Sequence, residues 1–258
     1  LGYTIHSWSK WFAVTGSVGK TTTVSLLGKL YKYVVGNNGI PTCSLPNNIL
    51  YGEPIVAEVS SAQLMINKAF KPHICAILNI IPNHLDFHAS LEEYTNVKLS
   101  IVQHQDENDY VLLPYDSLWG QDLKCKSQKI FIGGKLETGQ NCVYIEKNNV
   151  YLRLNNTAKV IFTINKTHLQ GQHNVRNILV AGTIAYLDYK SKLQIETMIE
   201  TFYPLEHRLE IFRIHQGIRY INDSKATTGY STIAALESLQ DSSCILIMGG
   251  KTKGANPY

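Results

Sequence analysis

The residues with the clearest chemical potential lie near the start of the chain, where an apolar run, Trp11–Val14, leads into a glycine-containing loop. A helical pattern begins at Lys20, and the order strand, glycine loop, helix is typical of a phosphate-binding loop. Backbone N–H groups of such a loop turn toward a phosphate, and the helix N-terminus adds partial positive charge. We therefore predict a nucleoside triphosphate site made by Gly16, Ser17, Gly19, Lys20, Thr21 and Thr22.

Two side chains of this loop have chemical roles of their own. Lys20 is placed to reach the terminal phosphates, and the Thr21 hydroxyl is placed to bind Mg²⁺. Val14 stands where the strict phosphate-loop pattern has glycine, so an ordinary strand-to-helix turn is the alternative. The lysine and two threonines in phase with the glycines favour the phosphate loop.

An acidic residue and a histidine follow the next two apolar runs. Ile55–Ala57 ends at Glu58, and Ile74–Leu78 is followed by a loop that contains His84. Carboxyl ends of parallel strands meet at one edge of a sheet, so we expect both side chains near the phosphate loop. A glutamate on an apolar strand is costly unless it is paired or binds metal, so Glu58 is predicted to bind Mg²⁺. The alternatives are an acid at a helix N-terminus and a loop histidine.

The composition describes a globular protein that acts on small molecules. Of 258 residues, 44% are hydrophobic and 17% charged, and the net charge of +4 suits anionic ligands. We expect no nucleic-acid partner, because no basic stripe with interleaved aromatics occurs, and no membrane insertion, because no apolar run approaches about 20 residues. The five scattered cysteines indicate a reducing cytoplasm, with Cys75 and Cys244 as buried thiols in apolar strands.

The elements that must position these residues alternate between strands and helices. The pattern predicts an α/β fold with a mostly parallel sheet and helices on both faces. Helices are expected from Lys20 to about Tyr33 and from Ser90 to about Gln105, with a loop over Val34–Leu45 between the first helix and the next strand. Hairpins are expected around Asn148-Asn149 and Gln216-Gly217.

Six short blocks then occur in a fixed order. They are Thr15 to Thr22, Glu58 to Leu64, Asn79 to Asp86, Gly171 to Asn177, Glu206 to Arg208, and Asn222 to Thr227. Together they resemble the Mur ligases, the ATP-dependent amino-acid-adding enzymes of peptidoglycan synthesis, and most of all the D-glutamate-adding branch. The resemblance implies a remnant or linker over residues 1–10, a central P-loop ATPase domain over 11–204 and the start of a C-terminal Rossmann-like domain over 205–258. The family's N-terminal UDP-binding domain is expected to be missing.

The resemblance also implies the reaction and its partners. The cofactors would be ATP and Mg²⁺, and the substrates UDP-N-acetylmuramoyl-L-alanine and D-glutamate. ATP would convert the first substrate's carboxylate to an acyl phosphate, which the amine of D-glutamate would attack. The protein would act as a cytoplasmic monomer.

Residue roles carried over from the family fall into three groups. The nucleotide contacts would be Asn174, Asn177, Arg208 and Asp223. The substrate contacts would be Asn37, Ser60 and Gln63 for the muramoyl substrate, and Lys225, Thr227 and Lys253 for D-glutamate. The catalytic residues would be Lys20, His84 and Lys98. Of these, His84 and an N-carbamylated Lys98 would hold a second Mg²⁺.

Plainer interpretations exist for several of these residues. Asn174 could cap a helix, Asn37 could belong to a turn, and Asp223 could pair with Lys225. Lys98 could be a solvated helix lysine. For the whole protein, the alternatives are another Mur or folylpolyglutamate-type ligase, or a non-catalytic P-loop nucleotide switch.

Overall fold

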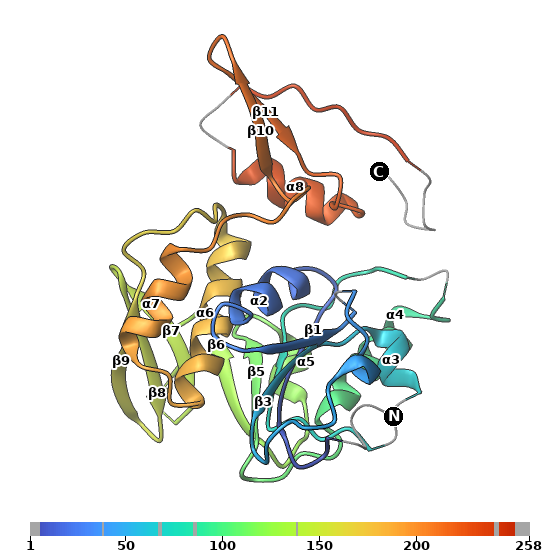
Figure 1. The fold of residues 1–258 in the computed structure, drawn as a ribbon, viewed down its shortest axis with the longest axis vertical. Helices are drawn as coiled ribbons and strands as arrows, with labels where there is room; N and C mark the ends of the chain where they lie inside the picture. The colour runs from blue at the N-terminus through green and yellow to red at the C-terminus, as the bar shows by residue number, and fades with distance from the viewer. Residues whose placement is uncertain are drawn as a thin grey trace.

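The computed structural model describes residues 6–37, 39–66, 69–84, 87–137, 139–239 and 243–250. Its main body is a nine-stranded sheet with helices on both faces, and a smaller C-terminal part lies above it (Figure 1). The α/β fold with a mostly parallel sheet is therefore confirmed.

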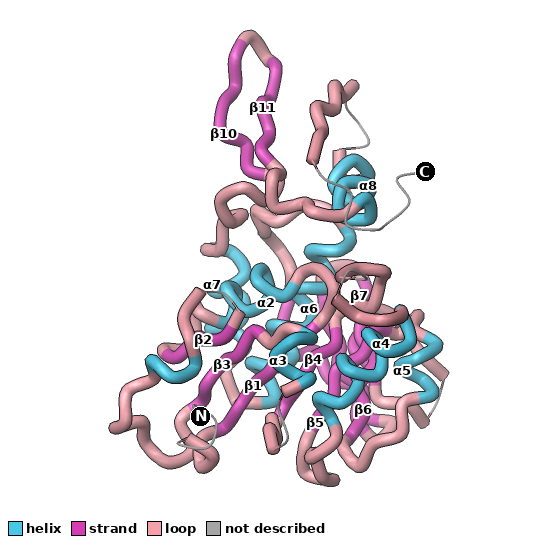
Figure 2. Tube along the Cα trace, turned by 90° about the vertical axis from the view of Figure 1, so that its right-hand side faces the viewer, coloured by secondary structure: helices cyan, strands magenta, loops and turns pink. Residues whose placement is uncertain are grey.

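The order of the strands brings the predicted site segments together. The sheet runs β2 (Tyr33–Gly36), β3 (Pro54–Glu58), β1 (Lys10–Thr15), β4 (Ile74–Ile77), β5 (Tyr110–Pro114), β6 (Gln128–Ile132), β7 (Cys142–Glu146), β8 (Asn149–Leu154) and β9 (Thr157–Thr163). In this spatial order each strand from β2 to β7, including β1, is parallel to its neighbours. Strands β8 and β9 then continue the sheet in antiparallel pairs. Figure 2 shows β2, β3, β1 and β4 side by side. Strand β1 lies between β3 and β4. The phosphate loop after β1 therefore lies between Glu58, at the end of β3, and the loop after β4 that leads to His84.

The helices cover the sheet in two layers. The helices are α2 (Lys20–Leu27), α3 (Ser61–Met65), α4 (Leu91–Leu99), α5 (Leu118–Asp122), α6 (Gln172–Leu187) and α7 (Lys192–Glu200), with 3₁₀ turns at Thr42–Ser44 and Ser100–Val102. Alternate residues of β1 explain the two layers, because side chains of a strand point to opposite faces. Phe12 and Val14 pack with α2, α6 and α7, whereas Trp11 and Ala13 pack on the other face.

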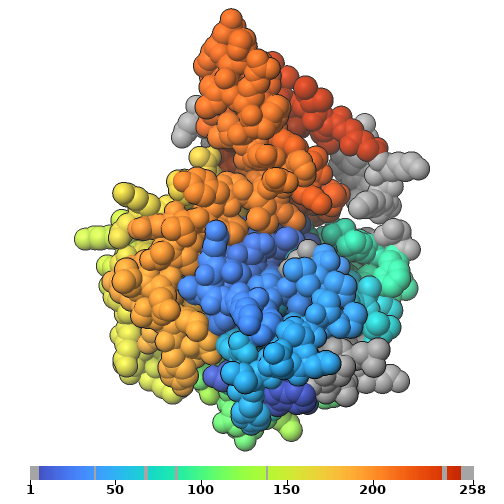
Figure 3. All heavy atoms as spheres, viewed as in Figure 1, coloured from blue at the N-terminus to red at the C-terminus, as the bar shows by residue number. Residues whose placement is uncertain are grey.

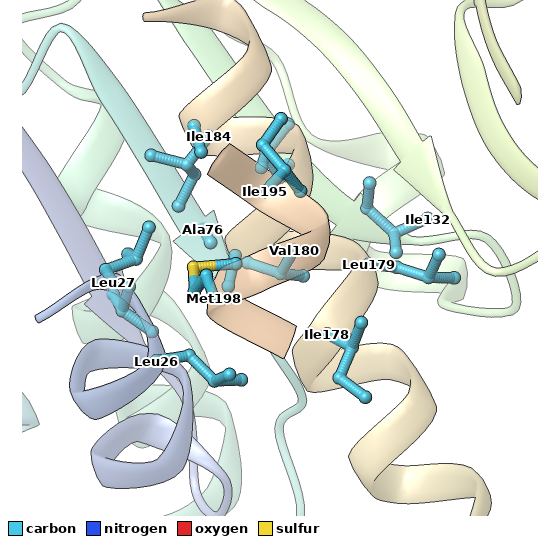
Figure 4. Packing of buried hydrophobic residues seen from close by; sticks show 14 of the residues in the cluster. Leu26, Leu27, Ala76, Ile132, Ile178, Leu179, Val180, Ile184, Ile195 and Met198 are labelled. Atoms are coloured by element: carbon cyan, nitrogen blue, oxygen red, sulfur yellow. The ribbon is translucent and has the colours of Figure 1, made fainter. Parts of the chain in front are cut away.

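The core on the first face holds the phosphate-loop helix in place. Leu26 and Leu27 of α2 pack against α6 and α7, where Ile184 and Met198 are also buried (Figure 4). These side chains are at most 1% exposed. Burying each large aliphatic side chain contributes roughly 1.5–3 kcal/mol, so α2 is a rigid support for the loop that precedes it.

The C-terminal part consists of the hairpin β10 (Glu210–His215) and β11 (Ile218–Asn222), then α8 (Gly229–Glu237). It projects from the main body (Figure 3). The hairpin around Gln216-Gly217 is confirmed. The division of the chain at 204/205 falls between α7 and β10 and stays a prediction.

Three local predictions are wrong. The first helix ends at Leu27 instead of Tyr33, and Tyr33–Gly36 is strand β2 instead of a loop. Gly28 ends the helix, and the β-branched residues that follow pair with β3, an interaction that local periodicity does not reveal. The helix that begins after Ser90 ends at Leu99 and continues only as a 3₁₀ turn.

Two smaller differences concern a hairpin and a cysteine. The predicted hairpin at Asn148-Asn149 exists, but Glu146 pairs with Asn149, so the turn lies one residue earlier. Cys75 is buried as predicted, whereas Cys244 is exposed and lies outside any strand in the described segment 243–250. A strand needs a paired neighbour, and the apolar composition around Cys244 does not supply one. Within the described residues, no helix is long and apolar enough to cross a membrane.

Candidate nucleotide and metal site

Three neighbouring parallel strands end at one edge of the sheet and bring the site together. In the strand register Val14 lies beside Glu58, and Thr15 lies beside Ile77. The phosphate loop, Glu58 and the loop that leads to His84 therefore start from adjacent strand ends. This is the edge at which ligands of open α/β sheets bind.

Gly19 has a conformation and a neighbour that exclude a side chain. Its φ angle of +87° lies in the left-handed region, where it caps the N-terminus of α2. A Cβ atom at this position would lie 2.6 Å from Oδ1 of Asn177 on α6. The loop is thus closely packed against the residue predicted to contact the nucleotide.

The side chain of Asn79, just after β4, holds the phosphate loop in shape. Its Oδ1 accepts hydrogen bonds from the backbone N–H groups of Ser17 (3.0 Å) and Val18 (2.9 Å), and its Nδ2 donates to the Val18 carbonyl (3.0 Å). The buried Ser17 hydroxyl also bonds to the hydroxyl of Tyr94 (2.9 Å). Sequence reasoning missed Asn79 and Tyr94 as site residues, although Asn79 begins one of the six blocks.

Lys20 lies over its own loop. Its Nζ donates to the carbonyl oxygens of Gly16 (2.9 Å) and Ser17 (3.3 Å). Burial lowers the pKa of Lys20, the charge of Glu58 raises it, and Arg208 lowers it further. The ammonium therefore lies within electrostatic reach of the predicted metal ligand and of the predicted phosphate contact.

Thr21 is reached by the C-terminal part of the chain. Nη2 of Arg208 donates to the Thr21 hydroxyl at 3.2 Å. The two residues are 187 positions apart in sequence. The predicted ATP contact Arg208 thus lies at the mouth of the phosphate loop.

Glu58 is almost completely buried, with 2% of its surface exposed. Its Oε1 accepts a hydrogen bond from Nδ2 of Asn37 (3.1 Å), whereas its Oε2 is fully buried without a hydrogen-bond partner. A buried, unpartnered carboxylate oxygen is costly, and a hard cation would satisfy it. Glu58 and the Thr21 hydroxyl therefore fit Mg²⁺, which uses one or two carboxylates together with phosphate oxygens and waters.

A second cation site with His84 is less complete. His84 is exposed and has a φ of 56° in the loop after β4. Among the described residues, no three His, Cys, Asp or Glu side chains lie close enough together to hold a metal. Leu85 and Asp86, which end the same block, lie outside the described residues.

Lys98 lies inside the site and is only 1% exposed. Its Nζ donates to the Gly16 carbonyl at 3.0 Å and to the Thr15 hydroxyl at 3.5 Å, and it lies 4.7 Å from the ring centroid of Tyr94. Burial, with a smaller contribution from the charge of Lys20, lowers the pKa of Lys98 to about 7. The alternative of a solvated helix lysine is wrong.

A cavity of about 810 Å³ joins the phosphate loop to the C-terminal part. Predicted nucleotide contacts on its wall are Gly19, Thr22, Asn174, Asn177, Arg208 and Asp223. Its volume lies within the range of small-molecule sites.

The two asparagines of α6 face the cavity as a pair. Nδ2 of Asn177 donates to Oδ1 of Asn174 (3.2 Å), whose own Nδ2 donates to the Gln170 carbonyl (2.7 Å). The N-cap of α6 is Gly171, so Asn174 does not cap this helix.

Asp223 is held by the backbone of the same C-terminal part. Its Oδ1 accepts from the Leu209 N–H at 3.0 Å, and burial raises the pKa of the carboxyl group. Lys225 and Thr227 are exposed on either side of Ala226, which lines the cavity. Lys253 lies outside the described residues.

Ser60 and Gln63 form a capping box that starts α3 directly after Glu58. The Ser60 hydroxyl accepts from the Gln63 N–H (3.4 Å), and the Gln63 side chain accepts from the Ser60 N–H (2.9 Å). The box holds both side chains at the strand edge that carries Glu58. Their predicted contact with substrate stays a prediction.

Comparison with known proteins defines the class of protein. The profile of the Mur ligase middle domain matches residues 14–185, and the chain belongs to this family. Several solved Mur ligases share the fold. One, MurF from Acinetobacter baumannii, has a TM-score of 0.70 at 19% identity, with 94% of this chain and 57% of that one covered.

Curated relatives are more similar in sequence. The UDP-N-acetylmuramoylalanine–D-glutamate ligase of Thermoanaerobacter pseudethanolicus is 38% identical over 251 residues, which are 95% of this chain and 55% of that protein. The protein of the same name from Clostridioides difficile is 35% identical, with 94% and 55% covered. The chain thus spans about half the length of the curated relatives that it matches.

Proposed function

We propose that the protein is an ATP- and Mg²⁺-dependent ligase that joins D-glutamate to UDP-N-acetylmuramoyl-L-alanine. The observation that carries the proposal is the group of half-buried Lys20 with buried Glu58 and Lys98 around one phosphate loop, whose Gly19 and Thr22 line a nucleotide-sized cavity. A simple nucleotide switch has no use for a buried lysine of lowered pKa. The names of the curated relatives support the choice of D-glutamate.

The chemistry proposed here has two steps. A carboxylate is a poor electrophile, so a carboxylate oxygen of the muramoyl substrate first takes the terminal phosphoryl group of ATP, and ADP leaves. The amine of D-glutamate then attacks the acyl carbon, and inorganic phosphate leaves as the amide forms. Catalysis of such transfers rests on positioning and on neutralisation of phosphate charge.

The residues of this chain divide that work. Lys20 and the loop N–H groups would bind the phosphates, while Thr21 and Glu58 would hold Mg²⁺, which supplies charge neutralisation when bound. Arg208 would meet the phosphates beside Thr21. Asn174, Asn177 and Asp223 would hold the rest of the nucleotide, since all three line the same cavity.

Lys98 has a different task in this proposal. A pKa of about 7 leaves a large fraction of its amine neutral at physiological pH, so the nitrogen can attack CO₂. An N–C bond forms, one proton passes to solvent, and the neutral amine becomes an anionic carbamate. Together with His84, this carbamate would be a ligand for a second Mg²⁺.

Substrate contacts complete the proposal. Asn37, Ser60 and Gln63 lie around the end of β3 and would meet the muramoyl substrate. Lys225, Thr227 and Lys253 would meet D-glutamate.

We place the central ATPase domain at 11–204 and the start of the C-terminal domain at 205–258.

The test is amide formation by the intact protein with ATP, Mg²⁺ and UDP-N-acetylmuramoyl-L-alanine. We expect product with D-glutamate and none with L-lysine, meso-diaminopimelate or L-alanine. Lys20→Ala should lower turnover about 10²–10³-fold, the usual cost of removing one stabilising donor, whereas the exposed Lys29→Ala should not. Turnover only with another amino acid would assign a different ligase. ATP hydrolysis that is equally fast without either co-substrate would indicate a nucleotide switch.

A further inference from the structure

The end of strand β2 is attached to Glu58 through both backbone and side chain. The Asn37 N–H donates to the Glu58 carbonyl at 2.9 Å, and Nδ2 of Asn37 donates to the Glu58 carboxylate at 3.1 Å. In the β2–β3 register, Gly36 lies directly beside Glu58. Asn37, the residue directly after β2, therefore holds both the main chain and the side chain of the predicted metal ligand.

Gly36 makes this close approach possible. Its φ is +106°, and a Cβ atom on it would lie 2.2 Å from the Glu58 carbonyl oxygen. Any side chain at position 36 would push β2 away from β3 and lift Asn37 off the carboxylate. The Gly36-Asn37 pair thus fits the role of holding Glu58.

The two carboxylate oxygens of Glu58 differ in their hydrogen bonding. Oε1 is held by Asn37, while Oε2 is fully buried and lacks a hydrogen-bond partner. Lys20 is within electrostatic reach, but its ammonium donates to the carbonyl oxygens of its own loop. A hydrogen bond to one oxygen restricts rotation of the carboxylate about its Cγ–Cδ bond, and this favours one direction for the other oxygen.

We propose that Asn37 is a positioning residue for the metal site, which fixes the Glu58 carboxylate through Oε1 so that Oε2 is presented to the cation. The inference rests on the proposed function, because it requires a cation at Glu58. It assigns Asn37 a task separate from substrate contact. Carboxylates that bind metals are commonly hydrogen-bonded in this way, and loss of such a partner typically costs about 10–100-fold in metal affinity or activity.

The experiment measures metal binding directly, without turnover. The intact protein is titrated with Mn²⁺ in the presence of a non-hydrolysable ATP analogue, and free Mn²⁺ is followed by electron paramagnetic resonance. Asn37→Ala should raise the apparent Kd for Mn²⁺ about tenfold or more. Asn37→Ser should raise the Kd in the same way, because the shorter serine side chain does not reach Oε1 of Glu58. This second variant is used for the test if the alanine variant does not fold.

The matched control is Asn165→Ala, which removes an exposed asparagine that donates to Thr163. Its Kd for Mn²⁺ should equal that of the unmodified protein. If the Asn37 variants bind Mn²⁺ normally and only the KM for the muramoyl substrate rises, Asn37 is a substrate contact and the inference is overturned. If the unmodified protein itself binds no Mn²⁺ with the nucleotide, the proposed function fails instead.

Discussion

Replacement of Lys98 by methionine tests the buried amine that the proposed chemistry needs. The folded protein lowers the pKa of Lys98 from 10.5 to about 7, chiefly through burial. Between these two pH values the unfolded chain holds a proton on Lys98 that the folded chain has released. The free energy of unfolding must therefore rise with pH across this range. Below about pH 7 the folded chain also holds the proton, so the destabilisation caused by burying the charged amine reaches its full size.

The size of the effect follows from the shift. At about 1.4 kcal/mol per pH unit, a change from 10.5 to about 7 corresponds to about 5 kcal/mol. Methionine keeps an unbranched side chain in the pocket and carries no charge, but it loses the hydrogen bond to the Gly16 carbonyl, worth about 1 kcal/mol. We expect Lys98→Met to be more stable than the unmodified protein by about 3–4 kcal/mol at pH 7. Near pH 10 it should be slightly less stable.

The assay is urea unfolding at several pH values from 7 to 10 in buffers freed of CO₂, so that no carbamate forms. The slope of free energy against urea concentration gives each stability, and an unchanged slope shows that the same surface is exposed on unfolding. Lys126→Met, at an exposed lysine, is the control and should leave the pH dependence unchanged. Parallel stability curves for Lys98→Met and the unmodified protein would refute the assignment of a lowered pKa to Lys98.

Three further predictions concern the same site. Gly19→Ala should weaken binding of an ATP analogue at least about tenfold by calorimetry, because the new Cβ meets Asn177 and a left-handed φ costs about 1–2 kcal/mol; Gly229→Ala, which meets nothing within 4 Å, should not. Asn79→Ala removes three hydrogen bonds to the phosphate loop and should weaken binding of the ATP analogue by about 1–3 kcal/mol in the same titration. Unchanged affinity would mean that the loop keeps its shape without these bonds. In bicarbonate, a mass spectrum of the intact protein should gain the mass of one CO₂, and this gain should be absent from Lys98→Met; an unmodified amine at bicarbonate saturation would contradict the carbamate.

Local signals in the sequence were sufficient for the supporting elements of the site. The apolar run before Gly16, the glycines and the helical pattern from Lys20 predict a strand, loop and helix, and β1 and α2 have this arrangement. These signals act over a few residues, so no long-range contact is needed to recognise them. The same limit explains the errors: β2 forms because Val34 and Val35 pair with β3, which is distant in sequence.

The sequence by itself determined which chemical groups are available and which strand ends carry them. Only the tertiary structure decided what those groups touch. Lys98 reaches the Gly16 carbonyl across 82 positions, and Asn37 reaches Glu58 across 21. These contacts depend on which strands become neighbours and on how deeply each side chain is buried, and the packing of the whole sheet sets both. A lysine that the sequence shows as an ordinary helix residue thus becomes a buried amine with a pKa of about 7.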